Sequence, residues 1–218
     1  KKYIDERKPK TTIFEGSATS DPLPVEKYSS SLAKTIEFFA QEKHASFRFV
    51  TKFADVDSLL NLEHNNKTEF IFSLNSKYTV NKFEKATPSI EERITASKKV
   101  ADANYQTGFL IAPIFIYDDW KKEYKELLEN IAEKFPDGGE KLSFELITHR
   151  FTERAKEIIK KAYPGTELPM NEEAREFKYG QFGYGKYVYP KETMKNMEKF
   201  FNEEINKILP KAEIKYFV

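Results

Sequence analysis

Residues 108–116, GFLIAPIFI, form a nearly unbroken apolar run in the middle of the chain. A strand with one solvated face alternates apolar and polar residues, whereas an unbroken run is typical of a parallel strand that is covered on both faces. Beyond this run, apolar side chains recur at intervals of three and four residues, at Trp120, Tyr124, Leu127 and Ile131. That spacing predicts a helix with one buried face, so this part of the chain forms a strand–helix unit.

Four further apolar runs are each followed by a segment with helical spacing, and they lie at residues 11–15, 47–52, 69–73 and 142–147. Five consecutive strand–helix units predict an α/β fold with a parallel sheet. A complete eightfold barrel needs about 250 residues, more than the 218 of this chain. The sheet is therefore either open or part of a barrel. On the covering helices we expect Tyr28 and Leu32 of the first, and Ile158 of the fifth, to face the core.

The pattern changes after residue 162. Residues 177–189, FKYGQFGYGKYVY, set three glycines among six aromatic side chains, which predicts a β-hairpin with a glycine-rich tip. A helix with Met197 and Phe201 on one face follows, and residues 213–217 are expected to form the last strand. We therefore divide the chain into a partial barrel at residues 1–162 and a C-terminal extension at residues 163–218.

Composition excludes several classes of function. The 218 residues carry 36 basic and 35 acidic side chains, a formal net charge of +1, so binding to nucleic acid must depend on a local surface. The absence of cysteine excludes disulfides and thiolate metal sites in this chain, and three scattered histidines do not predict a metal site. Without a membrane-spanning run or a leader, the expected location is cytoplasmic, with no membrane partner.

Polar side chains stand at the carboxyl ends of the predicted strands, where folds of this class place their sites. Glu15 can hold a ligand amino group or cap the next turn. Lys52 can bind a carboxylate or phosphate or extend into solvent. Ser73 and Asn75 fit a ribose or an amino-acid ligand, and ordinary turn chemistry explains them equally well.

The hairpin allows two interpretations. Its aromatic rings, with Arg175, Lys178 and Lys186 close by in sequence, suit insertion into a distorted duplex or stacking on unpaired bases. Alternatively, the ribbon packs against its own domain and half-buries its tyrosines.

Four segments, taken in order, go beyond these patterns: FEGSATSD at 14–21, RFVTKF at 48–53, FELITHRFT at 144–152 and YGQFGYGKY at 179–187. Together they resemble the spore photoproduct lyase family of radical S-adenosylmethionine enzymes, which repair DNA, from about residue 10 to Val218. The resemblance implies a partial parallel (β/α) barrel of the radical S-adenosylmethionine type, in which the five units here are the second to sixth.

The resemblance also implies a cofactor site. On the matching positions, S-adenosylmethionine is held through its methionine and ribose parts by Ser20, Lys52, Ser73 and Asn75. Ala112 and His149 border the adenine. At the hairpin tip, the positions of Gln181, Phe182 and Tyr184 contact the substrate.

Three features depart from the family pattern. The cysteine loop that holds the family's [4Fe–4S] cluster lies upstream of these residues, so the cluster is expected only with an N-terminal region. Ala18 stands where the family has the cysteine that donates the final hydrogen atom, which leaves the catalytic donor unknown. Gln181 and Phe182 replace an arginine and a tyrosine, which removes a bidentate phosphate partner.

The resulting hypothesis is the C-terminal portion of an enzyme that acts on thymine-dimer damage in DNA, by C–C lysis through a 5′-deoxyadenosyl radical. The alternatives are a non-catalytic nucleic-acid-binding relative and a radical S-adenosylmethionine enzyme with another substrate. The sequence does not indicate the oligomeric state.

Overall fold

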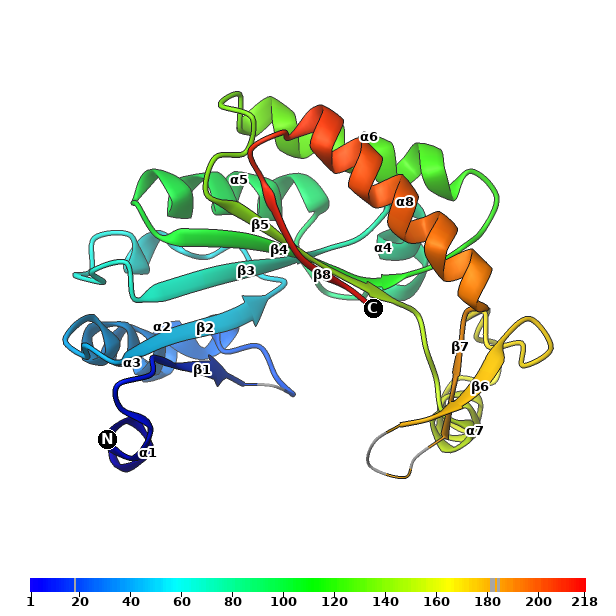
Figure 1. The fold of residues 1–218 in the computed structure, drawn as a ribbon, viewed down its shortest axis with the longest axis horizontal. Coiled ribbons are helices and arrows are strands. Elements are labelled where there is room, and N and C mark those ends of the chain that lie inside the picture. The colour runs from blue at the N-terminus through cyan, green and yellow to red at the C-terminus, as the bar shows by residue number, and fades with distance from the viewer. Residues whose placement is uncertain (18, 181–182, 184) are drawn as a thin grey trace.

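The computed structural model describes residues 1–17, 19–180, 183 and 185–218. Six parallel strands form one sheet in the order β1-β2-β3-β4-β5-β8, curled into a half-barrel (Figure 1). The strands are β1 (Thr12–Gly16), β2 (Ala45–Thr51), β3 (Thr68–Leu74), β4 (Gln106–Ile114), β5 (Leu142–Thr148) and β8 (Glu213–Phe217). The predicted partial parallel barrel is thereby confirmed.

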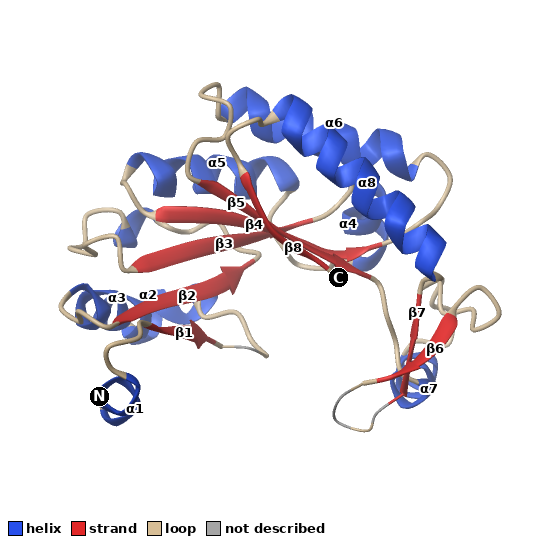
Figure 2. Ribbon diagram, viewed as in Figure 1, coloured by secondary structure: helices blue, strands red, loops and turns tan. Residues whose placement is uncertain are grey.

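Helices cover the outer face of the sheet (Figure 2). The α-helices are α1 (Lys2–Arg7), α2 (Glu26–Ser29), α3 (Ser31–Ala40), α4 (Lys77–Phe83), α5 (Ile90–Asp102), α6 (Trp120–Lys134), α7 (Glu153–Ala162) and α8 (Lys191–Ile208), with 3-10 turns η1 (Leu23–Val25) and η2 (Asp57–Leu59). Helix α3 packs on β2, α5 on β3 and β4, and α8 on α6. Every second residue of β2 is buried toward these helices, as Phe47 and Phe49 show, so the main core lies between the sheet and the helix layer.

The inner face of the half-barrel carries a network of charged groups. Arg48 on β2 donates to Glu145 on β5 at 2.5 Å, and Tyr216 on β8 donates to the other Glu145 oxygen at 2.6 Å. The pair spans two intervening strands. Beside it, Gly108 on β4 has no side chain and so leaves room for the side chains of Ser143 and Glu69. A flat sheet would hold β2 and β5 roughly 14 Å apart at the usual strand spacing, so this ion pair fixes the curl.

The first predicted helix is interrupted, and the expectation for Tyr28 is wrong. The chain turns at Ser30, which has a φ of 50°, and Tyr28 is 80% exposed. The cause is Glu26, whose buried carboxylate accepts hydrogen bonds from the backbone N–H groups of Leu32 at 2.6 Å and Ala33 at 3.0 Å. These N–H groups have no partner within α3, so Glu26 starts a new helix where the spacing alone suggests continuity.

The fifth predicted helix forms but does not cover the sheet. Helix α7 has no buried residue, and Ile158 is 57% exposed, so the expectation that Ile158 faces the core is wrong. Helix α7 lies beside the hairpin instead (Figure 1). Helix α8 contacts α6 and buries the side chains of Met197 and Phe201, a larger apolar face than α7 offers.

The C-terminal elements follow the sequence expectations. Strands β6 (Glu176–Tyr179) and β7 (Gly185–Val188) pair in antiparallel register as a hairpin, and β8 pairs in parallel with β5 at the end of the sheet. The chain thus returns to the sheet after the hairpin. Within the described ranges, no helix has both the length and the apolar character that crossing a bilayer requires.

Candidate functional site

The predicted site residues gather at the carboxyl edge of the parallel strands. Lys52 follows β2 directly, and Ser73 and Asn75 flank the last residue of β3. Ala112 is in the last part of β4, and His149 follows β5. Because all these strands run in the same direction, their carboxyl ends open on one edge of the half-barrel.

The loop that carries Ser20 is tied to the end of β2. The neighbouring Asp21 accepts hydrogen bonds from the Thr51 hydroxyl at 3.0 Å and from the backbone N–H of Lys52 at 2.7 Å. Ser20 itself is exposed, and its N–H donates to the Ser17 carbonyl at 3.1 Å. Asp21 therefore brings the Ser20 loop to Lys52, a role that the sequence analysis missed.

The Lys52 side chain does not extend freely into solvent. Its ammonium donates to Glu84 at 2.6 Å, and the side chain remains 35% exposed. Glu84 lies in the loop after α4, is only 6% exposed, and also accepts from Arg93 of α5 at 2.6 Å. Burial alone would raise the pKa of Glu84, but the hydrogen bonds from Lys52 and Arg93 outweigh it and lower this pKa below its usual value. Glu84 is thus an anion between two cations.

Asn75 is fully buried, and its amide is engaged in the scaffold. The amide NH₂ donates to the Pro113 carbonyl at 2.8 Å. Its oxygen accepts from the hydroxyl of Tyr124 at 2.7 Å and from the Ser76 N–H at 2.9 Å. Asn75 therefore joins the ends of β3 and β4 to helix α6, and at most one amide hydrogen remains for a ligand.

Ser73 and Ala112 offer groups that the scaffold does not use. The Ser73 carbonyl accepts from Arg93 at 3.0 Å, whereas its hydroxyl makes no hydrogen bond to any described residue. The pairing of β4 with β5 shifts between Ile111 and Ile114, which takes Ala112 out of the regular ladder. A break of this kind leaves backbone polar groups available to a ligand.

His149 is buried and neutral. Burial, together with the positive charge of Arg175, lowers the pKa of His149 to about 4. Arg175 lies 3.3 Å from Nδ1 of His149 and donates to the His149 carbonyl at 2.7 Å. Since a guanidinium can only donate, Nδ1 is the acceptor and the ring proton is on Nε2. His149 therefore presents an apolar ring with one N–H donor.

A series of contacting aromatic rings connects this edge to the hairpin. His149 lies 4.6 Å from the ring of Phe115 at the end of β4 and 5.7 Å from Phe151. Phe151 stacks on Tyr187 of β7 at 5.1 Å, and Tyr187 contacts Phe177 of β6 at the same distance. The hairpin is thus anchored through one face of β7.

Strand β6, in contrast, is open to solvent. Every residue of β6 is exposed, and the ring of Tyr179 is 80% exposed. Tyr187 packs inward, as the second interpretation predicts, while Phe177 and Tyr179 leave ring surface exposed. Binding of nucleic acid by the hairpin stays a prediction. The predicted contact residues Gln181, Phe182 and Tyr184, and also Ala18, lie outside the described residues.

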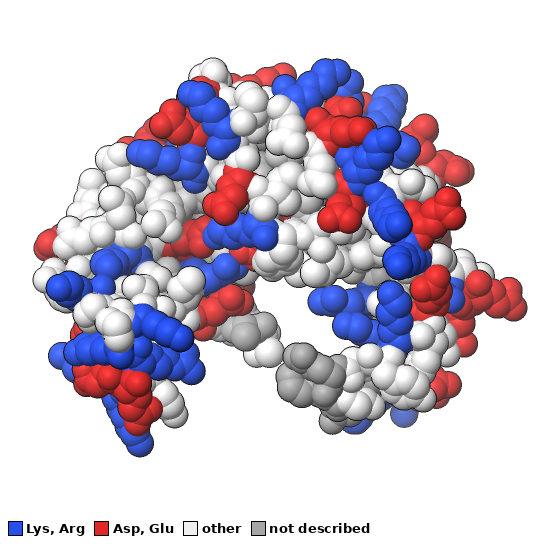
Figure 3. Space-filling view, in the orientation of Figure 1, with Lys and Arg blue, Asp and Glu red and all other residues white. Residues whose placement is uncertain are grey.

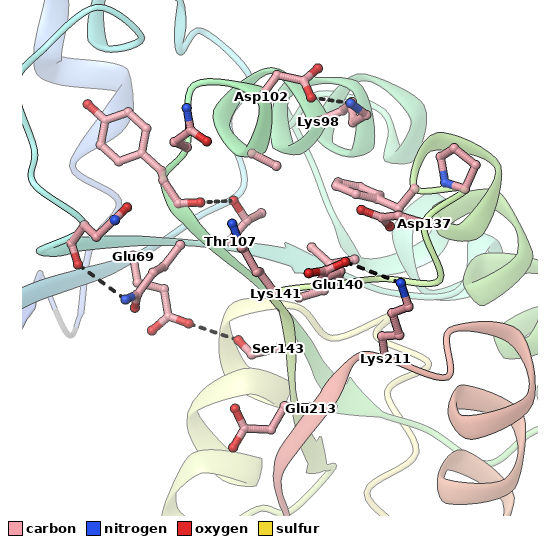
Figure 4. A pocket seen from close by; sticks show the side chains of 18 of the residues that line it. Glu69, Lys98, Asp102, Thr107, Asp137, Glu140, Lys141, Ser143, Lys211 and Glu213 are labelled. Atoms are coloured by element: carbon pink, nitrogen blue, oxygen red, sulfur yellow. Dashed lines mark hydrogen bonds and ion pairs between the residues drawn. The ribbon is translucent and has the colours of Figure 1, made fainter.

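A hollow of about 1030 Å³ lies at the opposite, amino edge of the strands (Figure 4). Thr107, Ser143 and Glu213, near the starts of β4, β5 and β8, line it. Its rim holds solvent-facing ion pairs such as Lys211 with Glu140 at 3.3 Å. Such pairs contribute little energy. Parallel-strand folds bind ligands at the carboxyl edge of their strands, so we place the candidate site at that edge.

The surface charge does not contradict a local binding site. Figure 3 shows basic and acidic side chains intermingled over the visible face, in agreement with the net charge of +1. A partner that carries negative charge must therefore be recognised by a few positioned cations rather than by the overall field.

The carboxyl edge fits S-adenosylmethionine, which has a carboxylate, a ribose and an adenine. Lys52 supplies a cation, Ser73 a free hydroxyl, and Ala112 backbone groups outside the ladder. The chain does not fit an iron–sulfur cluster, because it has no cysteine. Within the described residues, no three His, Asp or Glu side chains gather as a metal site. A cluster would need thiolates from outside these 218 residues.

Comparison with known proteins gives consistent matches. The family model described as spore photoproduct lyase matches residues 1–218. The curated spore photoproduct lyases of Clostridium acetobutylicum and Bacillus subtilis are 49% identical over 216 residues and 42% identical over 217 residues. These alignments cover 99% of this chain, which spans only 64% of the length of either relative.

Solved structures match equally well. A spore photoproduct lyase complexed with dinucleoside spore photoproduct has a TM-score of 0.95 and 43% identity, over 100% of this chain and 64% of that one. A mutant of spore photoproduct lyase with bound AdoMet and dinucleoside spore photoproduct has the same TM-score, identity and coverage.

Proposed function

This chain belongs to the spore photoproduct lyase family, and we propose that it forms the cofactor-binding and lesion-binding part of an enzyme that repairs spore photoproduct in DNA. The observation that carries the proposal is the match along the whole chain, with a TM-score of 0.95, to structures that hold AdoMet and the dinucleoside lesion. The chain spans 64% of those proteins, so the complete activity belongs to the longer protein.

In this proposal, the carboxyl edge holds S-adenosylmethionine. Lys52 and Ser20 bind the methionine part, while Ser73 and the remaining amide hydrogen of Asn75 bind the ribose. When bound next to a reduced [4Fe–4S] cluster, S-adenosylmethionine supplies a carbon-centred radical for C–C lysis. The chain's own groups orient it: the Lys52 ammonium suits the carboxylate, and the buried rings around His149 keep water from the adenine.

The hairpin would hold the damaged DNA. The exposed rings of Phe177 and Tyr179 supply stacking surfaces for bases, and Lys178 and Lys186 stand directly opposite each other in the hairpin register. Like charges at such positions repel each other, and a phosphate between them would relieve the repulsion. In the proposed division, residues 1–162 bind the cofactor and residues 163–218 contact the substrate through the hairpin, while β8 within the second range completes the sheet.

Two alternatives to this repair function follow from differences between the sequence and the family pattern. Ala18 replaces the hydrogen-donor cysteine of the family pattern, and Gln181 and Phe182 replace two residues at the hairpin tip. These differences favour either a relative with another substrate or a nucleic-acid-binding protein without chemistry.

The test is anaerobic incubation of the natural full-length protein, with reconstituted cluster, S-adenosylmethionine and dithionite, with and without dinucleoside spore photoproduct. We expect formation of 5′-deoxyadenosine that depends on the lesion, together with recovery of thymidine. Cofactor cleavage that is indifferent to the lesion would indicate another substrate. Absence of cleavage would indicate the binding protein.

A further inference from the structure

We propose that Glu84 and Arg93 are positioning residues that fix the Lys52 ammonium and keep its positive charge available for the carboxylate of the bound amino-acid part of the ligand. The inference rests on the proposed function for the identity of that ligand. Its basis is the series of contacts Lys52–Glu84–Arg93, called here the charged triad. No sequence motif pointed to Glu84 or Arg93.

The triad is fixed at its buried end. Arg93 is fully buried, and its guanidinium donates to the carbonyls of Ser73 at 3.0 Å and Pro88 at 2.9 Å, and to the Thr87 hydroxyl at 2.8 Å. These bonds leave it one orientation, in which it also donates to Glu84 at 2.6 Å. A planar guanidinium held at several points is a rigid support. Arg93 therefore ties the end of β3 to the loop that carries Glu84.

Glu84 transmits this order to Lys52. One carboxylate oxygen binds Arg93 and the other accepts from Lys52 at 2.6 Å. A lysine side chain is a point charge on a flexible stem, and this bond selects one of its many positions. Only one of the three ammonium hydrogens is used in the bond, and the side chain is 35% exposed, so two donors remain for a ligand.

The charges of the triad explain why two supporting residues are needed. Lys52 with Glu84 alone would be a neutral pair that attracts no anion. Arg93 neutralises Glu84, so the three groups together carry one positive charge, at the open end. The other carboxylate close by, Asp21, binds the backbone N–H of Lys52 rather than its ammonium. The site thus remains cationic where a ligand carboxylate would bind.

Equilibrium dialysis on the natural full-length protein, with its cluster reconstituted, tests this inference with two ligands that differ in one group. The ligands are S-adenosylmethionine and decarboxylated S-adenosylmethionine, and the readout is the ratio of their dissociation constants. For Glu84→Gln we expect S-adenosylmethionine to bind about tenfold more weakly, the effect of a lost charge-assisted contact, while the decarboxylated ligand binds nearly as before. Glu91→Gln is the matched control, because Glu91 is on the same helix as Arg93 and makes an exposed pair with Lys134.

A double-mutant cycle separates positioning from general stability. In a Lys52→Ala background, Glu84→Gln should leave the ligand ratio unchanged, because Glu84 acts through Lys52. If Glu84→Gln does not fold, Glu84→Asp serves in its place, since it keeps the charge beside Arg93 but shortens the reach to Lys52. Suppose that Lys52→Ala still lowers the preference for the ligand with the carboxylate. If Glu84→Gln then weakens the binding of both ligands equally, or of neither, the role of Glu84 is refuted while the proposed cofactor site stands. If Lys52→Ala leaves the ratio of the two dissociation constants unchanged, the proposed cofactor site is itself wrong.

Discussion

Replacing Glu145 with alanine would remove the group that links β2 to β5 and β8 across the inner face of the curled sheet. In the native chain, Glu145 is 3% exposed and binds Arg48 at 2.5 Å. It also accepts from Tyr216 at 2.6 Å. After the substitution, the Arg48 guanidinium keeps Glu15, which is half exposed and lies 3.3 Å from Nε, and the attraction of Glu69, its neighbour on β3. A largely buried cation would thus lose its main partner.

The expected loss of stability follows from this geometry. Removing one partner of a buried ion pair costs about 3–5 kcal/mol, and the remaining contact with Glu15 places the value near the lower end, at about 3 kcal/mol. For a chain of this size, that corresponds to a fall in melting temperature of roughly 6–12 °C. Replacing both partners by apolar residues, as Arg48→Met with Glu145→Leu, should recover most of the loss, because no unpaired charge remains.

Urea denaturation followed by circular dichroism measures these differences. A loss below about 1 kcal/mol for Glu145→Ala, the value of an exposed pair, would refute the claim that the pair holds the curl. So would a double variant that is less stable than Glu145→Ala. The variant Lys211→Ala, which breaks an exposed pair with Glu140, is the control and should change the stability little.

Three further predictions concern buried groups. Because burial holds the pKa of His149 near 4, the unfolded chain takes up the proton first as the pH falls. Stability should be full above about pH 6.5 and decrease toward pH 4, by at most about 3 kcal/mol, and His149→Gln should flatten this part of a pH series of urea melts. Gly108→Ala would place a Cβ 2.5 Å from the Ser143 hydroxyl and should lower the free energy of unfolding by about 1–3 kcal/mol. Adding Ser143→Ala to the same chain should recover part of this loss. Asn75→Ala leaves a buried carbonyl and the hydrogen of a buried tyrosine hydroxyl without a partner and should lower the melting temperature through a loss of about 2–4 kcal/mol. Asn75→Asp should cost at least as much, because its buried carboxylate would face the Pro113 carbonyl.

The alternation of apolar runs and helical spacings was sufficient to predict the parallel sheet, since both patterns follow directly from which faces are buried. It failed where a single polar side chain redirects the chain. Glu26 ends one helix and begins another through bonds to residues six and seven positions later, and no periodicity encodes such a bond. Helix α7 has helical spacing but little apolar area, so α8 covers the sheet.

The ends of the strands could be predicted from the sequence, and with them the positions of Lys52 and Ser73 at the candidate site. The supporting groups could not, because Asp21, Glu84 and Arg93 reach the edge from loops and a helix far along the chain. Their partners are set by the three-dimensional packing. The same limit applies to Asn75, whose residue type suits both a ligand and a turn, and whose bonds to the scaffold become visible only in the structure.

We propose that the carboxyl edge, rather than the hollow at the amino edge, holds S-adenosylmethionine. A crystal structure of the natural full-length protein with S-adenosylmethionine bound tests it most directly. We predict density with the ligand carboxylate in hydrogen-bonding distance of the Lys52 ammonium and the adenine beside Ala112. Density in the hollow next to Thr107 and Ser143, or at the carboxyl edge but out of reach of Lys52, would contradict it.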